Sequence, residues 1–130
     1  MSGHILVVDD NPINLKLASE ILLAGGYTVD GAVDAEHAQE LLTTVVPDLV
    51  LMDMSLPGMD GLALTRIIKA DARLKAVPVV ALTAYAMRGD DAKALDAGCD
   101  GYITKPIDTR ALVERVSAII NEARARLRKP

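Results

Sequence analysis

The sequence predicts an α/β domain: a five-stranded parallel sheet in strand order 2-1-3-4-5, with helices on both faces. Short apolar runs alternate with longer segments of helical period along the whole chain. Strict alternation of strand and helix is typical of parallel sheets, because each crossover helix packs back onto the sheet. With 130 residues and 51% hydrophobic content, the chain is expected to form one domain, residues 1–130, around an aliphatic core.

The first half of the chain is expected to supply three strands and two helices. The first strand covers residues 5–8, a run too short for a helix, and ends on Asp9 and Asp10. Asn11 and Pro12 then open a helix that Gly25 and Gly26 stop, with an inner face of Ile13, Leu17, Ala18, Ile21 and Leu22. A weaker strand follows over about residues 27–33.

Asp34 is expected to cap the second helix, which Pro47 closes and whose inner face carries Ala38, Leu41, Leu42 and Val45. The third strand, residues 49–52, ends on Asp53. Gly61 opens a third helix that carries Leu64, Ile67 and Ile68. The fourth strand, residues 78–82, ends on Thr83.

The end of the chain is expected to hold a thinly apolar helix, a short strand and a closing helix. The thin helix covers about residues 90–97, and the strand at Tyr102 and Ile103 leads to Thr104, Lys105 and Pro106. Asp108 caps the last helix, which turns inward Leu112, Val116, Ile119, Ile120 and Ala123. Its basic end, residues 124–129, is interpreted as solvated cations at a helix C-terminus. Five such units favour a flavodoxin-like winding.

Composition excludes several classes of function. Asp and Glu outnumber Lys and Arg 18 to 14, and a net charge of -4 argues against nucleic-acid binding. The lone Cys99 excludes a disulfide framework and fits a reducing compartment. Neither a signal peptide nor an apolar run of membrane-spanning length is found. We therefore expect a cytoplasmic protein that does not bind membranes. A monomer is also expected.

Polar residues follow four of the five expected strands: Asp9 and Asp10, Asp53, Thr83 and Lys105. Each alone is a common helix cap or strand terminator, but parallel strands deliver their ends to one edge of the sheet, where α/β domains bind ligands. Carboxylates brought together repel one another, so the site favours protonation of one carboxyl or a bound cation. A site with only oxygen ligands and open coordination positions suits Mg²⁺. A hydroxyl and an ammonium group beside it suit a phosphoryl group, which a carboxylate can accept as a nucleophile.

Other common sites are not indicated. His4 and His37 are expected at the surface, away from this edge, so a zinc site is not predicted. The glycine-rich phosphate loops of ATP-binding and dinucleotide-binding proteins are missing from the sequence.

The chain resembles the receiver domains of response regulators in two-component signalling, the CheY-like superfamily. The matching motifs are VVDDN at residues 7–11, LMDMSLPGMDG at 51–61, LTA at 82–84 and GYITKPI at 101–107. Their spacing and order match over essentially the whole chain. The longer segments VVALTAYAMRGD at 79–90 and AGCDGYITKPI at 97–107 look most similar to single-domain cell-division regulators of this family and to the receivers of hybrid kinases.

The resemblance implies a role for each site residue. Asp53 would accept a phosphoryl group from a histidine kinase or a histidine phosphotransfer protein. Asp10, Asp53 and the backbone carbonyl of Ser55 would bind Mg²⁺, with Asp9 acting through water. Lys105 would contact the phosphoryl group, and Thr83 and Tyr102 would form the switch pair.

Three hypotheses about the whole protein remain open. The chain is a single-domain phosphorylation switch without an output domain, which signals to an unknown downstream protein by contact and catalyses only its own phosphorylation and dephosphorylation. Alternatively, it is a receiver fragment of a hybrid kinase or multidomain regulator. The third hypothesis is a Mg²⁺-dependent phosphohydrolase with an aspartate nucleophile. Such enzymes usually carry a second acid two residues after the nucleophile, where this chain has Ser55.

Overall fold

A computed structural model describes residues 3–53, 61–83, 99–104 and 109–128. Five parallel strands form one sheet in the order β2-β1-β3-β4-β5, which confirms the predicted winding. The strands are β1 (His4–Val8), β2 (Thr28–Ala32), β3 (Leu49–Asp53), β4 (Val79–Thr83) and β5 (Gly101–Thr104). The helices are α1 (Pro12–Ala24), α2 (Ala35–Leu42), α3 (Gly61–Ala70) and α5 (Thr109–Arg128). The expected helix at residues 90–97 and the Asp108 cap lie outside the described residues.

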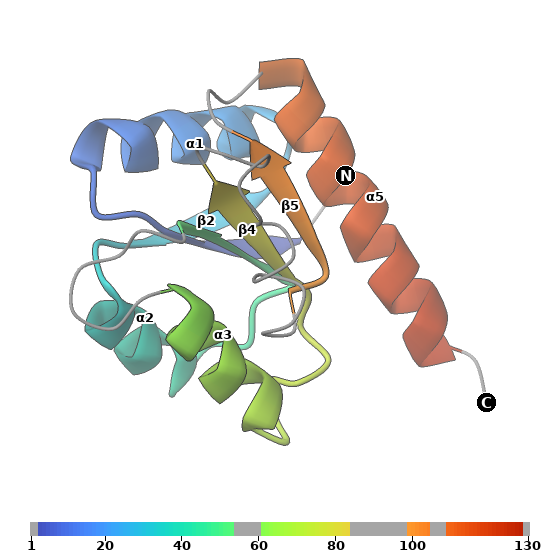
Figure 1. Cartoon of the computed structure of the whole chain (residues 1–130). Helices are drawn as coiled ribbons and strands as arrows, with labels where there is room; N and C mark the ends of the chain where they lie inside the picture. The colour runs from blue at the N-terminus through green and yellow to red at the C-terminus, as the bar shows by residue number, and fades with distance from the viewer. Residues whose placement is uncertain (1–2, 54–60, 84–98, 105–108, 129–130) are drawn as a thin grey trace.

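The helices cover both faces of the sheet, with α1 and α5 on one side and α2 and α3 on the other (Figure 1). Successive strand residues point to opposite faces. In β3, Leu49 and Leu51 therefore join the core cluster under α1 and α5, while Val50 and Met52 join the cluster under α2 and α3. All five residues of β3 are buried, so the central strand holds Asp53 firmly at its carboxyl end.

Helix α1 begins and ends where the sequence predicts. The Asn11 side-chain oxygen accepts hydrogen bonds from the backbone N–H groups of Ile13 at 2.9 Å and Asn14 at 3.2 Å. At the other end, Gly26 has a φ of 98°, a conformation that glycine adopts without strain. The backbone N–H groups of Gly26 and Tyr27 donate to Leu23 and Leu22, each at 3.1 Å, which makes a Schellman cap.

The predicted inner face of α1 is wrong in part. Ala18, Ile21 and Leu22 are buried, but Ile13 is 78% exposed and Leu17 is 45% exposed. At about 100° per residue, Ile13 lies about 140° around the helix axis from Ala18, beyond the reach of the sheet. Helix α1 therefore contacts the sheet and α5 through a narrower stripe of residues than its apolar pattern predicts.

Helices α2 and α3 also differ from expectation. Helix α2 ends at Leu42, so Val45 lies beyond it, and Pro47 does not set its end. The hydroxyls of Thr43 and Thr44 donate to the backbone oxygens of Glu40 at 2.6 Å and Leu41 at 3.4 Å, a local bonding pattern that competes with helix continuation. In α3, Leu64 and Ile68 are buried but Ile67 is 43% exposed.

Helix α5 turns Leu112, Val116, Ile120 and Ala123 into the core as predicted, and Ile119 is partly buried. Its basic end is not simply solvated, because the Arg124 guanidinium lies 3.5 Å from the Asp48 carboxylate. No helix in the described part of the chain combines the length and the apolar character needed to cross a lipid bilayer.

Candidate functional site

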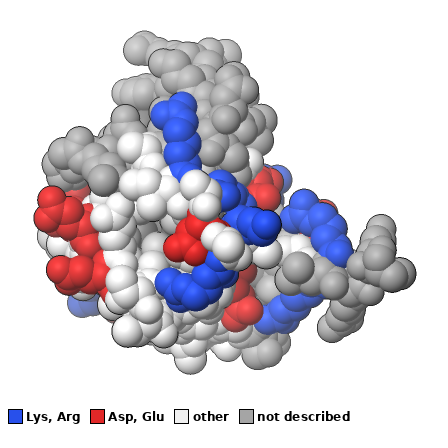
Figure 2. All heavy atoms as spheres, turned by 90° about the horizontal axis from the view of Figure 1, so that it is seen from below, with Lys and Arg blue, Asp and Glu red and all other residues white. Residues whose placement is uncertain are grey.

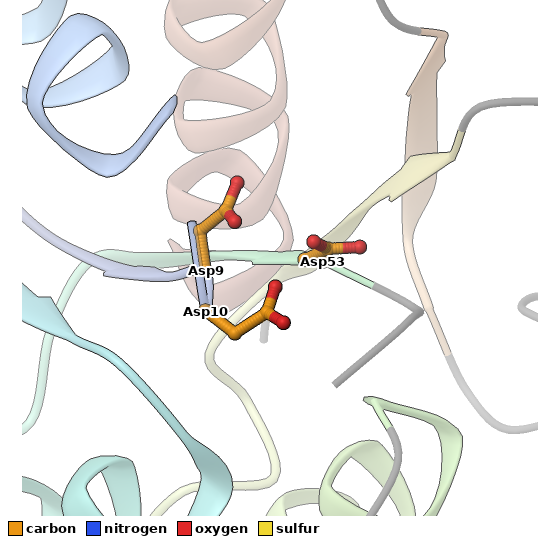
Figure 3. Close-up of side chains that lie close together, drawn as sticks. All are labelled: Asp9, Asp10 and Asp53. Atoms are coloured by element: carbon orange, nitrogen blue, oxygen red, sulfur yellow. The ribbon is translucent and has the colours of Figure 1, made fainter. Parts of the chain in front are cut away.

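Three carboxylates meet at the carboxyl edge of the sheet. Val8 and Met52 are register partners in β1 and β3, so the residues after them, Asp9 and Asp53, come side by side. One carboxylate oxygen from each of Asp9, Asp10 and Asp53 lies within 4.8 Å of the others. Figure 3 shows Asp9 and Asp10 at the end of one strand and Asp53 at the end of its neighbour. The convergence predicted for these three acids is present.

The three carboxylates differ in their exposure. Asp9 is 1% exposed and Asp53 is 4% exposed, whereas Asp10 faces solvent. Asp9 is held by the turn that follows it, since its Oδ1 accepts a hydrogen bond from the Asn11 N–H at 2.9 Å. Its own N–H donates to the Ala32 carbonyl at 3.0 Å and extends the ladder with β2. Two fixed buried acids and one exposed acid therefore line the site.

Electrostatics favours a cation at this position. Two like unit charges about 4 Å apart repel by roughly 1 kcal/mol in water and by roughly 4 kcal/mol at a protein surface. Protonation of one carboxyl or a bound cation relieves this repulsion. The donor atoms are all carboxylate oxygens, the type that Mg²⁺ prefers while it keeps several waters. The residues present fit a small divalent cation.

The remaining predicted site residues are placed only in part. Thr83 is the last residue of β4 and pairs with Thr104, and Tyr102 pairs with Ala81. Tyr102 is partly buried and packs against the core cluster under α2 and α3. Ser55 and Lys105 lie outside the described residues, so their roles stay predictions.

The sulfur atoms of Met52 and Cys99 both lie beside the hydroxyl of Thr65, near the end of β3. No pattern in the sequence predicted this cluster. The buried Thr65 hydroxyl, on α3, lies 3.7 Å from the sulfur of Met52 and 3.7 Å from that of Cys99. Burial raises the pKa of the Cys99 thiol above its ordinary value, and the hydrogen bond with Thr65 opposes this only in part. A neutral thiol and a hydroxyl thus join α3 to the residues just before β5.

Neither histidine belongs to the group of three carboxylates, but only His4 lies at the opposite edge of the sheet as expected, since α2 begins at the carboxyl edge and carries His37 in its first turn. His4 begins β1, at the opposite end from Asp9. Its ring nitrogens lie 2.6 Å from the Thr28 hydroxyl and 2.7 Å from the Asp30 carboxylate, so the ring braces β1 against β2. His37 belongs to the first turn of α2, where its N–H donates to the capping Asp34 at 2.8 Å.

Comparison with known proteins identifies the class of domain. The model of the response regulator receiver domain matches residues 5–117. The chain is 36% identical over 123 residues to the polar-differentiation response regulator DivK of Brucella ovis, covering 95% of this chain and 100% of DivK.

Two solved structures share the fold. One is the receiver domain of the sensor histidine kinase PA1611 from Pseudomonas aeruginosa, with a magnesium ion coordinated in its active-site cleft. It has a TM-score of 0.86 and 35% identity, with 93% of this chain and 99% of that chain covered. The other is a response regulator of Chloroflexus aurantiacus, with a TM-score of 0.89, 29% identity and the same coverage of both chains.

The parallel sheet, its acidic edge and the match to the family model together define a receiver domain, which is a signalling domain rather than a classical enzyme. The chain belongs to the response regulator receiver domain family of two-component systems. The general mechanism of this family is phosphorylation of an aspartate with Mg²⁺, and its members interact with histidine kinases or phosphotransfer proteins and with downstream effectors.

Proposed function

We propose that this chain is a single-domain phosphorylation switch in which Asp53 is the phosphoacceptor. The observation that carries the proposal is the position of Asp53, buried at the end of the central strand with Asp9 and Asp10 within 4.8 Å. The match to DivK over that protein's whole length supports a response regulator of this size. We propose that it acts by protein contact. The phosphoryl donor is a histidine kinase or a histidine phosphotransfer protein, and a downstream protein reads the result.

Mg²⁺ would be held by Asp10, Asp53 and the backbone carbonyl of Ser55, with Asp9 acting through water. The three converging carboxylates support this assignment, since their charge calls for a cation. When bound, the ion supplies positive charge that offsets the carboxylates and the oxygens of an incoming phosphoryl group. The magnesium ion in the PA1611 receiver gives a precedent within the family.

The transfer itself needs one nucleophile. A carboxylate oxygen of Asp53 attacks phosphorus, the P–O bond forms, and the P–N bond of the donor phosphohistidine breaks. The bonding pair leaves with the imidazole nitrogen. Lys105 would contact the phosphoryl oxygens and balance their charge. Water attack on the acyl phosphate releases inorganic phosphate and restores the Asp53 carboxylate. We propose that these two reactions, its own phosphorylation and dephosphorylation, are the only ones that the chain catalyses.

The test is phosphate uptake from acetyl phosphate in the presence of Mg²⁺. Asp53→Asn keeps the size of the side chain but removes the nucleophile, so uptake should disappear. Borohydride trapping followed by mass spectrometry should locate the label on Asp53 of the parent protein. Asp34→Asn is a matched control, because asparagine caps a helix as well as aspartate does and uptake should persist. Label on Asp9, Asp10 or Asp60 would contradict the assignment.

We further propose that Thr83 and Tyr102 read out the phosphorylation. Register pairs Ala81 with Tyr102 and Thr83 with Thr104, so the two residues lie two positions apart on adjacent strands. The carbonyl of Tyr102 accepts a hydrogen bond from Arg115 at 3.0 Å, which connects β5 to α5. A phosphoryl group adds about -1.5 to -2 charge units beside the end of β4, and that change biases an element with two states.

The readout is tested with Thr83→Ala, using beryllofluoride as a stand-in for the phosphoryl group. The variant should still be phosphorylated on Asp53. The NMR shift changes that beryllofluoride causes over residues 84–102 should be smaller than in the parent. Thr28→Ala, on the edge strand β2, is the matched control and should respond fully. A full response of Thr83→Ala would show that the signal travels by another route.

A further inference from the structure

A groove lies at the amino edge of the sheet, opposite the acidic site. It consists of two cavities of about 210 and 220 Å³ that meet at Ala76 and Ala123, which line both. The groove runs between the segment that leads into β4 and the end of α5. Its cations, which define what we call the basic groove, are Lys69, Arg73, Lys75, Arg124 and Arg126.

The basic groove is separate from the phosphorylation site. Its lining includes Asp48, Pro78 and Asp100, the residues directly before β3, β4 and β5. Asp48 and Asp53 are five residues apart along β3, a distance of roughly 16 Å at about 3.3 Å per residue. A ligand in the groove would therefore not touch the acidic residues at the other edge.

Positive charge gathers at the groove although the chain is acidic. Five cations and two carboxylates line the two cavities, whereas the chain as a whole carries a net charge of -4. Figure 2 shows Lys and Arg side chains gathered on this side of the molecule, with carboxylates between them. This local excess of positive charge attracts an anionic partner and not a cationic one.

Three of the cations are held in place by the fold. The Lys69 ammonium donates to the Val77 carbonyl and the Asp100 carboxylate, each at 2.8 Å. Arg124 pairs with Asp48 at 3.5 Å, and Arg73 donates to the carbonyl of Leu42. These bonds give the groove fixed walls.

The other two cations, Lys75 and Arg126, are exposed. Neither forms an ion pair with any residue in the described ranges. They line the second cavity and are positioned to meet carboxylates from outside the chain. The first cavity is mainly apolar, with Val46, Val77, Pro78 and Ile120 in its lining.

We propose that the basic groove binds an extended acidic segment of a partner protein. An apolar side chain of the segment fills the first cavity, and neighbouring carboxylates pair with Lys75 and Arg126. Two adjoining open cavities, one mainly apolar and one mainly charged, suit an extended peptide better than a compact ion. The proposal does not depend on phosphorylation at Asp53. An experiment can therefore contradict one of the two proposals and leave the other unaffected.

The probe is a short, labelled, C-terminally amidated peptide in which leucine alternates with glutamate. Added to the ¹⁵N-labelled full chain, it should shift the amide resonances of Ala76, Val77 and Ala123, and binding should weaken as salt is raised. The double variant Lys75→Glu/Arg126→Glu should bind roughly tenfold more weakly or worse, since both contacts become repulsive. Lys16→Glu/Arg66→Glu, which changes the net charge equally outside the groove, should bind nearly as well as the parent.

A second variant tests the cavity itself. Ala76→Leu places a bulky side chain where the two cavities meet and should also weaken binding, although it changes no charge. An unchanged NMR spectrum away from the groove confirms that each variant is folded. Equal peptide affinity of the charge-reversed and parent proteins, or shifts centred on Asp53, would overturn the proposal. So would binding to phosphatidylglycerol vesicles in place of the peptide.

Discussion

At the scale of single residues, the three aspartates of the site have different surroundings. Asp9 and Asp53 are buried, and Asp9 is held through the Asn11 N–H, while Asp10 faces solvent. A buried acid is held in one position, whereas an exposed acid is free to approach a hydrated ion. This difference makes Asp10 the residue whose replacement disturbs the fold least.

Asp10→Asn should weaken Mg²⁺ binding by roughly tenfold or more, because one of the carboxylate charges that attract the ion is lost. Stability in the absence of the ion should be unchanged or higher, since repulsion with Asp9 and Asp53 is relieved. Calorimetric titration with MgCl₂ and urea unfolding measure the two effects. The control is Glu36→Gln, an exposed acid on α2, which should keep the affinity of the parent. If Asp10→Asn binds Mg²⁺ as tightly as the parent, the metal assignment is wrong.

At the scale of elements, α1 shows how a helix places a site. Asn11 does two things, since its side chain caps α1 while its backbone N–H bonds to Asp9. The start of the helix and the position of a site carboxylate therefore depend on one turn. The Schellman cap at Gly25 and Gly26 then turns the chain into β2.

Replacing Asn11 with Ala should cost about 1 kcal/mol of unfolding free energy, because the N–H groups of Ile13 and Asn14 lose their acceptor. Asn11→Ser retains a capping oxygen and should cost much less. Urea unfolding followed by circular dichroism compares the three proteins. Equal stabilities of Asn11→Ala and Asn11→Ser would mean that the cap contributes nothing to the stability of the fold.

At the scale of the whole molecule, two core clusters sandwich one sheet, and a buried hydrogen bond joins distant parts of the chain. The Tyr27 hydroxyl, just before β2, lies 2.6 Å from the Ser117 hydroxyl of α5. Both residues are less than a tenth exposed. The last helix is thereby tied to the first strand–helix–strand unit, on the side of the sheet where α1 packs.

A double-mutant cycle on Tyr27→Phe and Ser117→Ala measures the energy of the hydrogen bond between the two hydroxyls. The coupling energy between the two substitutions should be about 1 kcal/mol, as for a buried neutral hydrogen bond. Thermal or urea unfolding of the four proteins supplies the numbers. Strictly additive effects would indicate that the two hydroxyls stabilise the fold independently of each other.

Much of the fold and part of the site were predictable from local patterns. Hydrophobic period, caps and strand-ending acids are short-range properties, and they predicted the sheet order, the Asn11 and Asp34 caps and the convergence of Asp9, Asp10 and Asp53. The comparison with known receivers then established the family. The two caps follow from neighbouring residues. The sheet order and the convergence of the three acids follow from the regular alternation of strands and helices, which allows few windings and brings all strand ends to one edge.

Other features depend on how the elements pack, which no local pattern encodes. Ile13 and Leu17 are apolar yet exposed, because only the tertiary contact sets which stripe of α1 meets the sheet. The Arg124–Asp48 pair, the Thr65 contacts with two sulfur atoms and the basic groove each join residues far apart in the chain. The sequence by itself determined which elements form and which acids end the strands. Only the tertiary structure decided which side chains those elements bury, pair or leave open to a partner, because burial depends on the neighbour that packs against each face.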